Sequence, residues 1–276
     1  MKEISTDGRR PVCLTIAGLD PSGGAGIIAD IRTFSAFGCI AAGAVSSTTF
    51  QNTAGVSGAV HQSADSVRSQ IESVLDEHEV AAVKTGMLPT REIVEKVAAM
   101  IKERQLRNVV VDPVIRSTSG YELIDPNALT AIIEKLFPRA DLITPNIPEA
   151  EAIAGIEIDS RGKIEKAAGI MRSMGARNVL IKGGHLSEVK SEKGKVKSEG
   201  RIAKDYLFVG SELTTFEAKF VETARTRGTG CMLSSAIAAN LALGNDLLGS
   251  VRIAKEFVTE AIRSSHLAGA KTVGVR

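Results

Sequence analysis

The chain has 276 residues, 43% of them hydrophobic, a length that allows one large α/β domain or two small ones. Its formal net charge is only +2, its aromatic content is 4% and it has no tryptophan, which argues against a polyanion-binding surface and against base stacking. We therefore expect a single α/β domain over residues 1–276 that binds no nucleic acid.

The cysteines and the N-terminal residues bear on the cellular compartment. Cys13, Cys39 and Cys231 show no CxxC or Cys/His ligand spacing, which predicts a reducing environment and no cysteine-bound metal. Residues 1–10 form a polar, charged tail, and no apolar stretch reaches the length of a membrane span. These features predict a cytoplasmic protein without a membrane partner.

Short apolar runs alternate with amphipathic stretches along most of the chain. The runs predicted to be buried strands are residues 12–17, 41–48, 81–85, 108–112, 141–144 and 178–182. The stretches predicted to be helices are residues 27–37, 65–78, 90–103, 125–137, 148–154 and 163–174. This alternation predicts a doubly wound, mostly parallel sheet with helices on both faces and ligands at the carboxyl ends of the strands.

Two later segments break the alternation. Residues 187–204 are dominated by Lys, Glu, Ser and Gly, which predicts a solvated loop without a catalytic role. Residues 205–209 and 212–216 flank Gly210-Ser211 and are predicted to pair as an antiparallel hairpin at one edge of the sheet.

The segment Gly228-Thr229-Gly230-Cys231 opens a long apolar run, residues 232–243, that is predicted to be a helix. A helix N-terminus has unpaired N–H groups and a partial positive charge, so a glycine-rich entry to it suits a phosphate. The same dipoles favour the thiolate of Cys231, the form in which a thiol acts as a base or nucleophile. The alternative is that the glycines only shape a turn and Cys231 is a small buried hydrophobe.

The glycine-rich segment at residues 24–29 imitates a dinucleotide-binding fingerprint of the form GxGxxA. That fingerprint expects an acidic residue about twenty positions further on, and residues 44–49 contain none. The segment also lacks the Gly-Lys-Ser/Thr ending of a P-loop. Neither a nicotinamide cofactor nor a P-loop is indicated, and a backbone-lined pocket floor near Asp20 and Asp30 remains.

Seven loop motifs occur in one order along the chain. They are Gly18-Leu19-Asp20-Pro21-Ser22-Gly23-Gly24-Ala25-Gly26, Gln51-Asn52-Thr53, Lys84-Thr85-Gly86-Met87-Leu88, Asp112-Pro113-Val114, Thr144-Pro145-Asn146-Ile147-Pro148-Glu149-Ala150-Glu151, Lys182-Gly183-Gly184-His185 and Gly228-Thr229-Gly230-Cys231. Over residues 12–268 they strongly resemble the hydroxymethylpyrimidine and phosphomethylpyrimidine kinases of thiamine biosynthesis, in the ribokinase-like superfamily. The resemblance implies a ribokinase-like fold and a homodimer. It also implies ATP-dependent phosphorylation of 4-amino-5-hydroxymethyl-2-methylpyrimidine and then of its monophosphate.

The resemblance implies a catalytic role for the glycine loop. The amides of Gly228, Thr229, Gly230 and Cys231 would stabilise charge on the moving phosphoryl group. Cys231 would accept the proton of the substrate's hydroxymethyl group. A free thiol has a pKa of about 8.5, which is high for a base, so we expect the helix N-terminus to lower it.

The resemblance also implies residues for the nucleotide and its metal. Asn146 and Glu149 match an Asn-x-x-Glu element that places Mg²⁺-ATP through metal-bound waters. Lys182 is expected to meet a phosphate, and Asp112 to assist electrostatically. The alternatives are that Asn146 and Glu149 only cap a helix and that Lys182 only extends from a strand end to solvent. His185 is expected to be structural.

For the pyrimidine, the resemblance points to Ala25, Asp30, Gln51, Met87 and Val114. Asp30 is expected to accept a hydrogen bond from a ring amine, and Gln51 to donate and accept. Met87 and Val114 are expected to supply apolar walls.

The chain departs from the family pattern near the predicted chemistry. Arg225 and Arg227 stand where the family has Asn and His, and Thr118 stands where it has Lys, with Arg116 two positions earlier. The Gly/His-rich tail usual in the family is missing beyond His266. We expect Arg227 to reach the nucleotide's phosphates. Two alternatives stay open: a pyridoxal kinase that keeps the same Gly-Thr-Gly-Cys loop, and a pyrimidine-binding regulatory protein that has lost transfer activity.

Overall fold

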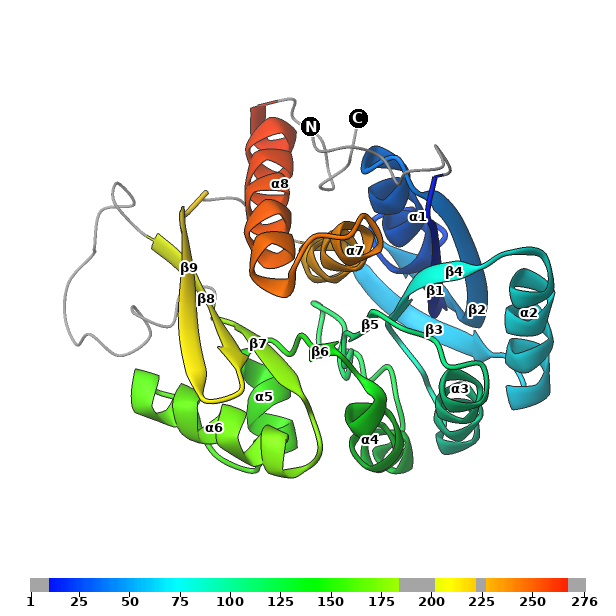
Figure 1. Ribbon diagram of the computed structural model, residues 1–276, viewed down its shortest axis with the longest axis horizontal. Coiled ribbons are helices and arrows are strands. Elements are labelled where there is room, and N and C mark those ends of the chain that lie inside the picture. Colours follow the sequence, from blue (N-terminus) through cyan, green and yellow to red (C-terminus); the bar gives the residue numbers. More distant parts are fainter. Residues whose placement is uncertain (1–9, 184–201, 222–226, 268–276) are drawn as a thin grey trace.

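One sheet organises the computed structural model, which describes residues 10–183, 202–221 and 227–267. Its nine strands lie in the order β3-β2-β1-β4-β5-β6-β7-β8-β9 (Figure 1). The strands are β1 (Val12–Leu19), β2 (Ile40–Asn52), β3 (Gly55–His61), β4 (Val80–Thr85), β5 (Val109–Val111), β6 (Leu142–Ile143), β7 (Asn178–Lys182), β8 (Ile202–Val209) and β9 (Glu212–Lys219). Pairing is parallel from β2 to β7 and antiparallel where β3, β8 and β9 join.

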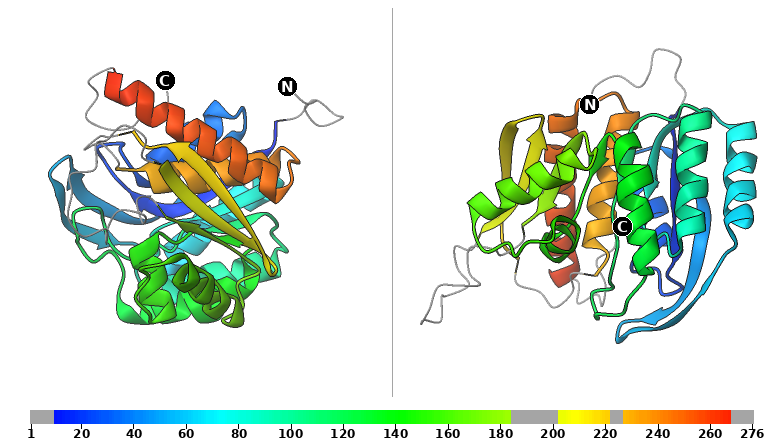
Figure 2. Two further views of the ribbon diagram at one scale, coloured as in Figure 1. Left: turned by 90° about the vertical axis from the view of Figure 1, so that its left-hand side faces the viewer. Right: turned by 90° about the horizontal axis from the view of Figure 1, so that it is seen from below.

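Helices cover both faces of this sheet and make three layers (Figures 1 and 2). One face carries α1 (Gly26–Ala36), α7 (Thr229–Ala242) and α8 (Leu247–Leu267). The other carries α2 (Ala64–Glu77), α3 (Arg91–Glu103), α4 (Pro126–Ala131), α5 (Ile147–Ala154) and α6 (Arg161–Ser173). In the described part of the chain, none of these helices is both long enough and apolar enough to cross a membrane.

Each helical layer packs on its own hydrophobic cluster, and the strands supply residues to both. In β7, Val179 and Ile181 belong to the cluster under α2 to α6, whereas Leu180 belongs to the cluster under α1, α7 and α8. Successive side chains of a strand point to opposite faces of a sheet. A strand buried on both faces therefore reads as a continuous apolar run, as the central strands of this chain do.

The predicted doubly wound, mostly parallel sheet is confirmed, and each predicted strand and helix overlaps an observed element. Antiparallel pairing occurs at both edges of the sheet, however, whereas the sequence predicted it at one. Strand β3 escaped prediction because two glycines interrupt its seven residues and weaken the strand pattern. The hairpin is longer than expected: β8 begins at Ile202, inside the predicted loop 187–204, and residues 187–201 of that loop lie outside the described residues.

Two helical segments also differ from expectation. The helix predicted at residues 125–137 ends as α4 at Ala131 and continues as a π-helical turn (Ile132–Leu136) and a 3₁₀ turn (Phe137–Arg139). Pro138 has no N–H to donate, so a regular α-helix does not run past it. The long C-terminal helix α8 was not predicted, although Val251, Ala254 and Val258 repeat at helical spacing and are buried.

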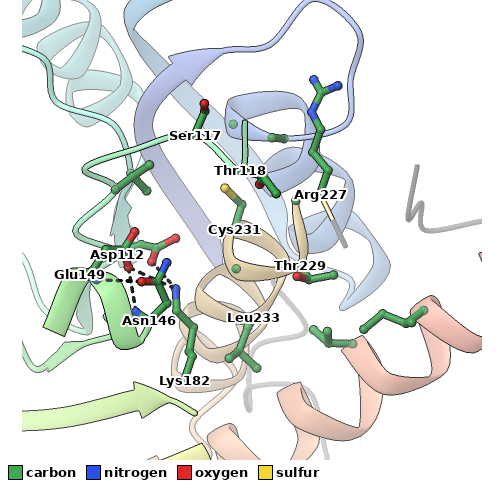
Figure 3. Close-up of a pocket in the computed structure, with 18 of the residues that line it drawn as sticks. Asp112, Ser117, Thr118, Asn146, Glu149, Lys182, Arg227, Thr229, Cys231 and Leu233 are labelled. Carbon is green, nitrogen blue, oxygen red and sulfur yellow. Dashed lines mark hydrogen bonds and ion pairs between the residues drawn. The ribbon is translucent and has the colours of Figure 1, made fainter. Parts of the chain in front are cut away.

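From β1 the chain adds β2 and β3 on one side of it and then crosses to β4 on the other side. The order of the strands therefore reverses at β1. In an open α/β sheet, ligands bind outside the carboxyl ends of the strands at such a reversal. The carboxyl ends of β1, β4, β5, β6 and β7 all meet at that edge, and the N-terminus of α7 lies beside them (Figure 3).

Candidate active site

A cavity of about 480 Å³ lies at the carboxyl ends of these strands, beside the first turn of α7 (Figure 3). Every residue predicted from the sequence to belong to the site lines this cavity, with the exception of Asp30. Those brought together are Ala25, Gln51, Met87, Asp112, Val114, Asn146, Glu149, Lys182, Arg227, Gly228, Thr229, Gly230 and Cys231. Residues separated by more than 200 positions in sequence therefore face one space.

The glycine loop approaches the β1–α1 loop more closely than any side chain would allow. Gly228 is the N-cap of α7 with a φ of 82°, in the left-handed region that favours glycine. A Cβ atom on Gly228 would lie 1.9 Å from the carbonyl oxygen of Gly24. Gly228 has no side chain to cap this helix end, and a glycine-rich helix N-terminus of this kind suits an anion.

Cys231 lies in the first turn of α7 and is half-buried, whereas Cys13 and Cys39 are buried. Burial raises the pKa of its thiol to about 11, and the carboxylates of Asp30 and Asp112 act in the same direction. The ammonium of Lys84 and the backbone N–H of Gly26 act against them. The expectation that the helix terminus lowers this pKa is wrong, because burial outweighs the favourable groups.

Lys182, at the end of β7, is held between two carboxylates. Its Nζ atom lies 2.8 Å from Oδ1 of Asp112 and 4.0 Å from Oε2 of Glu149. Burial acts to lower the pKa of Lys182, but these two negative charges outweigh it and raise the pKa. Burial also acts to raise the pKa of Asp112, and the charges of Lys182 and Lys84 outweigh it and lower the pKa. Lys182 is thus paired at the cavity wall, with its side chain 14% exposed, rather than extended into solvent.

Asn146 and Glu149 form a capping box at the start of α5. The Glu149 backbone N–H donates to Oδ1 of Asn146 at 2.9 Å, and the Asn146 backbone N–H donates to Oε2 of Glu149 at 2.8 Å. Burial and the nearby Asp112 raise the pKa of Glu149 to about 7, although Lys182 opposes the shift. The capping alternative is therefore confirmed as one role, and both residues also line the cavity.

Asp30 does not face the cavity, and the prediction that it contacts a ring amine is wrong. Its carboxylate is fully buried beneath α7. Oδ2 accepts from Thr15 Oγ1 at 2.7 Å and from Lys84 Nζ at 2.8 Å, and Oδ1 accepts from Ser235 Oγ at 2.7 Å. Both oxygens are therefore engaged by protein groups, and the side chain that reaches the cavity is that of Lys84.

Arg227 is bound to the loops at the other end of the cavity. Its guanidinium pairs with the carboxylate of Asp20 and donates to Ser22 Oγ at 2.8 Å. With the Gln51 amide turned so that its nitrogen donates to Thr49 Oγ1, the amide oxygen accepts from Arg227 Nε at 3.0 Å. These contacts occupy the guanidinium with residues of the β1–α1 loop and β2.

Figure 3 shows Arg227 and Lys182 on opposite sides of Cys231. Arg227 was expected to reach the nucleotide's phosphates; in the structure its guanidinium binds Asp20 and Ser22, and its contact with a phosphate stays a prediction. Arg116 also lines the cavity, and its guanidinium pairs with Glu122 at 2.6 Å in an exposed turn. Thr118 and Ser117 lie above the cavity on the same side as Arg227.

Two of the residues singled out from the sequence, His185 and Arg225, lie outside the described residues. The side chain of His266 is likewise outside them.

Comparison with known proteins identifies the family. The sequence model of the family described as phosphomethylpyrimidine kinase matches residues 20–276. The chain belongs to this family. A hydroxymethylpyrimidine/phosphomethylpyrimidine kinase from Aquifex aeolicus is 38% identical over 258 residues, which are 94% of this chain and 96% of the relative.

Solved structures agree with this assignment. A phosphomethylpyrimidine kinase from Clostridium difficile is 38% identical, with a TM-score of 0.77 over 92% of this chain and 100% of that one. A pyridoxal kinase from Bacillus subtilis, solved as an ADP complex, is 35% identical, with a TM-score of 0.79 over 92% of each chain. The chain is thus a kinase with a ribokinase-like fold.

The kinase cavity extends beyond the predicted residues toward α8 and the hairpin. Its apolar walls there are Phe220, Val221, Leu233, Val258 and Ile262. Lys255 of α8 pairs with Asp205 of β8 at 2.6 Å beside them. The helical spacing of Val258 and Ile262 in α8 was a sequence signal for this end of the cavity, but no motif marks it.

Proposed function

We propose that this kinase phosphorylates 4-amino-5-hydroxymethyl-2-methylpyrimidine and then its monophosphate, with ATP as the phosphoryl donor. The supporting observation is the position of Cys231. It lies between the Lys182–Asp112 pair on one side and Arg227 on the other, within one cavity (Figure 3). A proton acceptor beside an anion-binding helix terminus is the arrangement that phosphoryl transfer to an alcohol requires.

The transfer step uses the first turn of α7. The thiolate of Cys231 takes the proton from the substrate's hydroxymethyl O–H, and that oxygen forms a bond to the γ-phosphorus of ATP. The bond between the γ-phosphorus and its bridging oxygen breaks, and the electron pair leaves with ADP. The amides of Gly228, Thr229 and Gly230 stabilise the charge on the transferring group, because they are fixed before the reaction.

The second phosphorylation uses the same step with a different acceptor. A phosphate oxygen of the monophosphate takes the place of the hydroxymethyl oxygen at the γ-phosphorus.

The nucleotide occupies the end of the cavity that leads to α8. Val258 and Ile262 offer an apolar wall for a base, and Lys182 approaches the phosphates. Asp112 holds the Lys182 ammonium at 2.8 Å and is itself buried, so the lysine is oriented before the nucleotide arrives.

The residues at this end suit Mg²⁺ better than a metal held by protein alone. Among the described residues there is no group of three His, Cys, Asp or Glu side chains that could enclose an ion. Mg²⁺ keeps several waters and binds through one or two carboxylates plus substrate phosphates. Asn146 and Glu149 would hold it through water, and the bound ion would neutralise charge on the phosphate oxygens.

The pyrimidine occupies the end lined by Ala25, Gln51, Met87 and Val114. With its oxygen accepting from Arg227 and one N–H donating to Thr49, the Gln51 amide has a second N–H for the ligand. It is therefore a donor for a ring nitrogen, and Met87 and Val114 pack against the ring. We place the protein in the cytoplasm, because a reducing compartment keeps Cys231 as a free thiol.

Pyridoxal is the competing substrate, because the chain also resembles a solved pyridoxal kinase. The test is the initial rate of ADP formation with ATP, magnesium and each alcohol alone, followed by competition between the two. We expect the higher kcat/KM with the hydroxymethylpyrimidine. A higher value with pyridoxal would assign the chain to the alternative, and no turnover with either would favour the regulatory protein.

A further inference from the structure

Lys84 is a charged residue of the cavity that the proposed mechanism does not use. It lies near the carboxyl end of β4, its side chain is 0% exposed, and it lines the same cavity as Cys231. Lysine is almost never fully buried without a partner, because its desolvation costs several kcal/mol. The contacts of Lys84 must therefore account for a buried ammonium in the wall of this cavity.

The partner of Lys84 is Asp30, and Ser235 in the second turn of α7 binds the pair. Nζ of Lys84 is 2.8 Å from Oδ2 of Asp30, and Ser235 donates to the other carboxylate oxygen at 2.7 Å. Ser235 follows Cys231 by four residues in one helix, so both side chains lie on the same face, one turn apart. Lys84 lines the cavity that Cys231 also lines, and Asp30 does not. The positively charged member of the pair is therefore the one on the same side as the thiol.

We propose that the Lys84 ammonium stabilises the thiolate of Cys231, and that Asp30 acts as the positioning residue that holds this ammonium in place. The proposal rests on the proposed function, since it concerns the base of that reaction. It assigns Asp30 an indirect role in place of the substrate contact expected from the sequence.

The charges around Cys231 are consistent with this role. Lys84 of β4 and Lys182 of β7 both interact favourably with the thiolate, whereas Asp30 of α1 and Asp112 after β5 oppose it. Lys84 has the largest favourable effect on the pKa of the thiol, larger than the opposing effect of Asp30. The net effect of the Lys84–Asp30 pair is therefore to favour the thiolate.

Lys84 also stays charged despite its burial. Burial acts to lower the pKa of its ammonium, but the negative charges of Asp30, the Cys231 thiolate and Asp112 outweigh it and raise the pKa. The space for the ammonium depends on Gly86, since a Cβ atom there would lie 2.8 Å from Nζ of Lys84. The Lys84-Thr85-Gly86 motif thus accommodates a cation in the wall of the cavity that Cys231 also lines.

The test is the pH dependence of Cys231 alkylation by iodoacetamide, with the modified peptide identified by mass spectrometry. Cys13 and Cys39 are buried, so Cys231 is the expected target. Lys84→Met alone leaves a buried carboxylate unpaired and risks misfolding, so the main variant is the double change Lys84→Met with Asp30→Asn. The amide that replaces the Asp30 carboxylate keeps an oxygen and a similar shape for Thr15 and Ser235.

We expect alkylation of the folded double variant at pH 8 to be about threefold to tenfold slower than in the wild type. The matched control is Lys255→Met with Asp205→Asn, which removes another Lys–Asp pair from the opposite end of the cavity. It should leave the alkylation profile unchanged. An unchanged profile in a folded Lys84→Met, Asp30→Asn variant would overturn the proposal.

Alkylation separates this inference from the proposed function. If the profile shifts as expected but the wild type phosphorylates no pyrimidine, the substrate assignment fails and the role of Lys84 toward Cys231 stands. If the profile does not shift but Cys231→Ala abolishes phosphorylation, Cys231 remains the base and the role of Lys84 fails.

Discussion

At the scale of single residues, the groups around the Cys231 thiol have opposite effects on its pKa. The helix N-terminus, Lys84 and the Gly26 N–H favour the thiolate, whereas burial and the carboxylates of Asp30 and Asp112 favour the thiol. Burial dominates, so Cys231 is mostly protonated at neutral pH in the protein without ligands. Once formed, its thiolate is a strong base, and in the proposed mechanism that form accepts the substrate proton.

Replacing Cys231 by Ala should abolish most of the turnover. Loss of a general base typically lowers kcat about 100-fold to 10,000-fold, whereas the walls that hold the pyrimidine belong to other residues. Steady-state kinetics should show the fall in kcat, and calorimetry should show nearly unchanged substrate affinity. A variant that keeps more than half of wild-type kcat would remove Cys231 from its role as the base.

The rate of the reaction should rise with pH. Because the pKa of Cys231 is raised to about 11, its thiolate fraction grows about tenfold for each pH unit below that value. We therefore expect kcat with saturating substrates to increase steadily from pH 6 to pH 9, at constant ionic strength. A rate that is flat or falls over this range would mean that the thiolate does not limit turnover.

Arg227 should affect the pyrimidine more than ATP. Its contacts to Asp20 and Gln51 fix the Gln51 amide, so Arg227→Gln should raise the KM for the pyrimidine by about tenfold, equal to about 1.4 kcal/mol. The matched control is Arg32→Gln, because Arg32 donates to Gly23 of the same loop at 3.1 Å but does not line the cavity. If instead the KM for ATP rises and that for the pyrimidine does not, Arg227 serves the nucleotide.

The sequence motifs predicted most of the residues that line the cavity. They did not predict the role of a residue, such as Asp30, that depends on contacts made only in the folded chain. Cys231, Lys182 and Glu149 lie in loops whose glycines and polar residues mark a ligand edge, and they do line one cavity. Asp30 is on a helix, and sequence does not reveal which side of that helix faces the cavity. Its contact with Lys84, 54 positions away, becomes visible only in the packed structure.

At the scale of elements, the site depends on the close approach of the α7 N-terminus to the β1–α1 loop. Gly228 permits this approach in two ways, by its positive φ and by its lack of a Cβ atom. The second requirement is the specific one, because the carbonyl oxygen of Gly24 occupies the place that a side chain would take.

Gly228→Ala should displace the glycine loop and weaken nucleotide binding. The control is Gly244→Ala, because Gly244 has the same φ of 82° but nothing within 4 Å of its added Cβ atom. Both variants carry the backbone strain of about 1 kcal/mol, and only Gly228→Ala adds a clash. We expect a larger loss of melting temperature and at least a tenfold loss of ADP affinity by calorimetry for Gly228→Ala. Equal effects of the two changes would mean that the close approach is unimportant.

The helices and strands with the most regular spacing of apolar residues were predicted best. The central strands and the helices α2, α3 and α6 follow from apolar spacing, since each buries one regular face or run. The edge strand β3 did not follow, because a strand at a sheet edge carries little apolar pattern and here contains two glycines. Helix α8 was overlooked despite its pattern, and with it the nucleotide end of the cavity.

At the scale of the whole molecule, the order of the strands determines where chemistry occurs. The reversal at β1 brings the ends of β1, β4, β5 and β7 to one edge, and α7 and α8 close the other side of the cavity. In the proposed function, the nucleotide and the pyrimidine occupy opposite ends of this cavity and meet at Cys231. The same frame serves relatives named for pyrimidines and for pyridoxal, so the substrate follows from the lining residues and not from the fold.

The most direct test of the account is the identity of the products over time. Purified protein is incubated with ATP, magnesium and 4-amino-5-hydroxymethyl-2-methylpyrimidine, and the pyrimidine species are followed by mass spectrometry. We expect the monophosphate to appear first and then to decline as the diphosphate accumulates. Absence of any phosphorylated pyrimidine, in protein that readily converts pyridoxal to its phosphate, would contradict it.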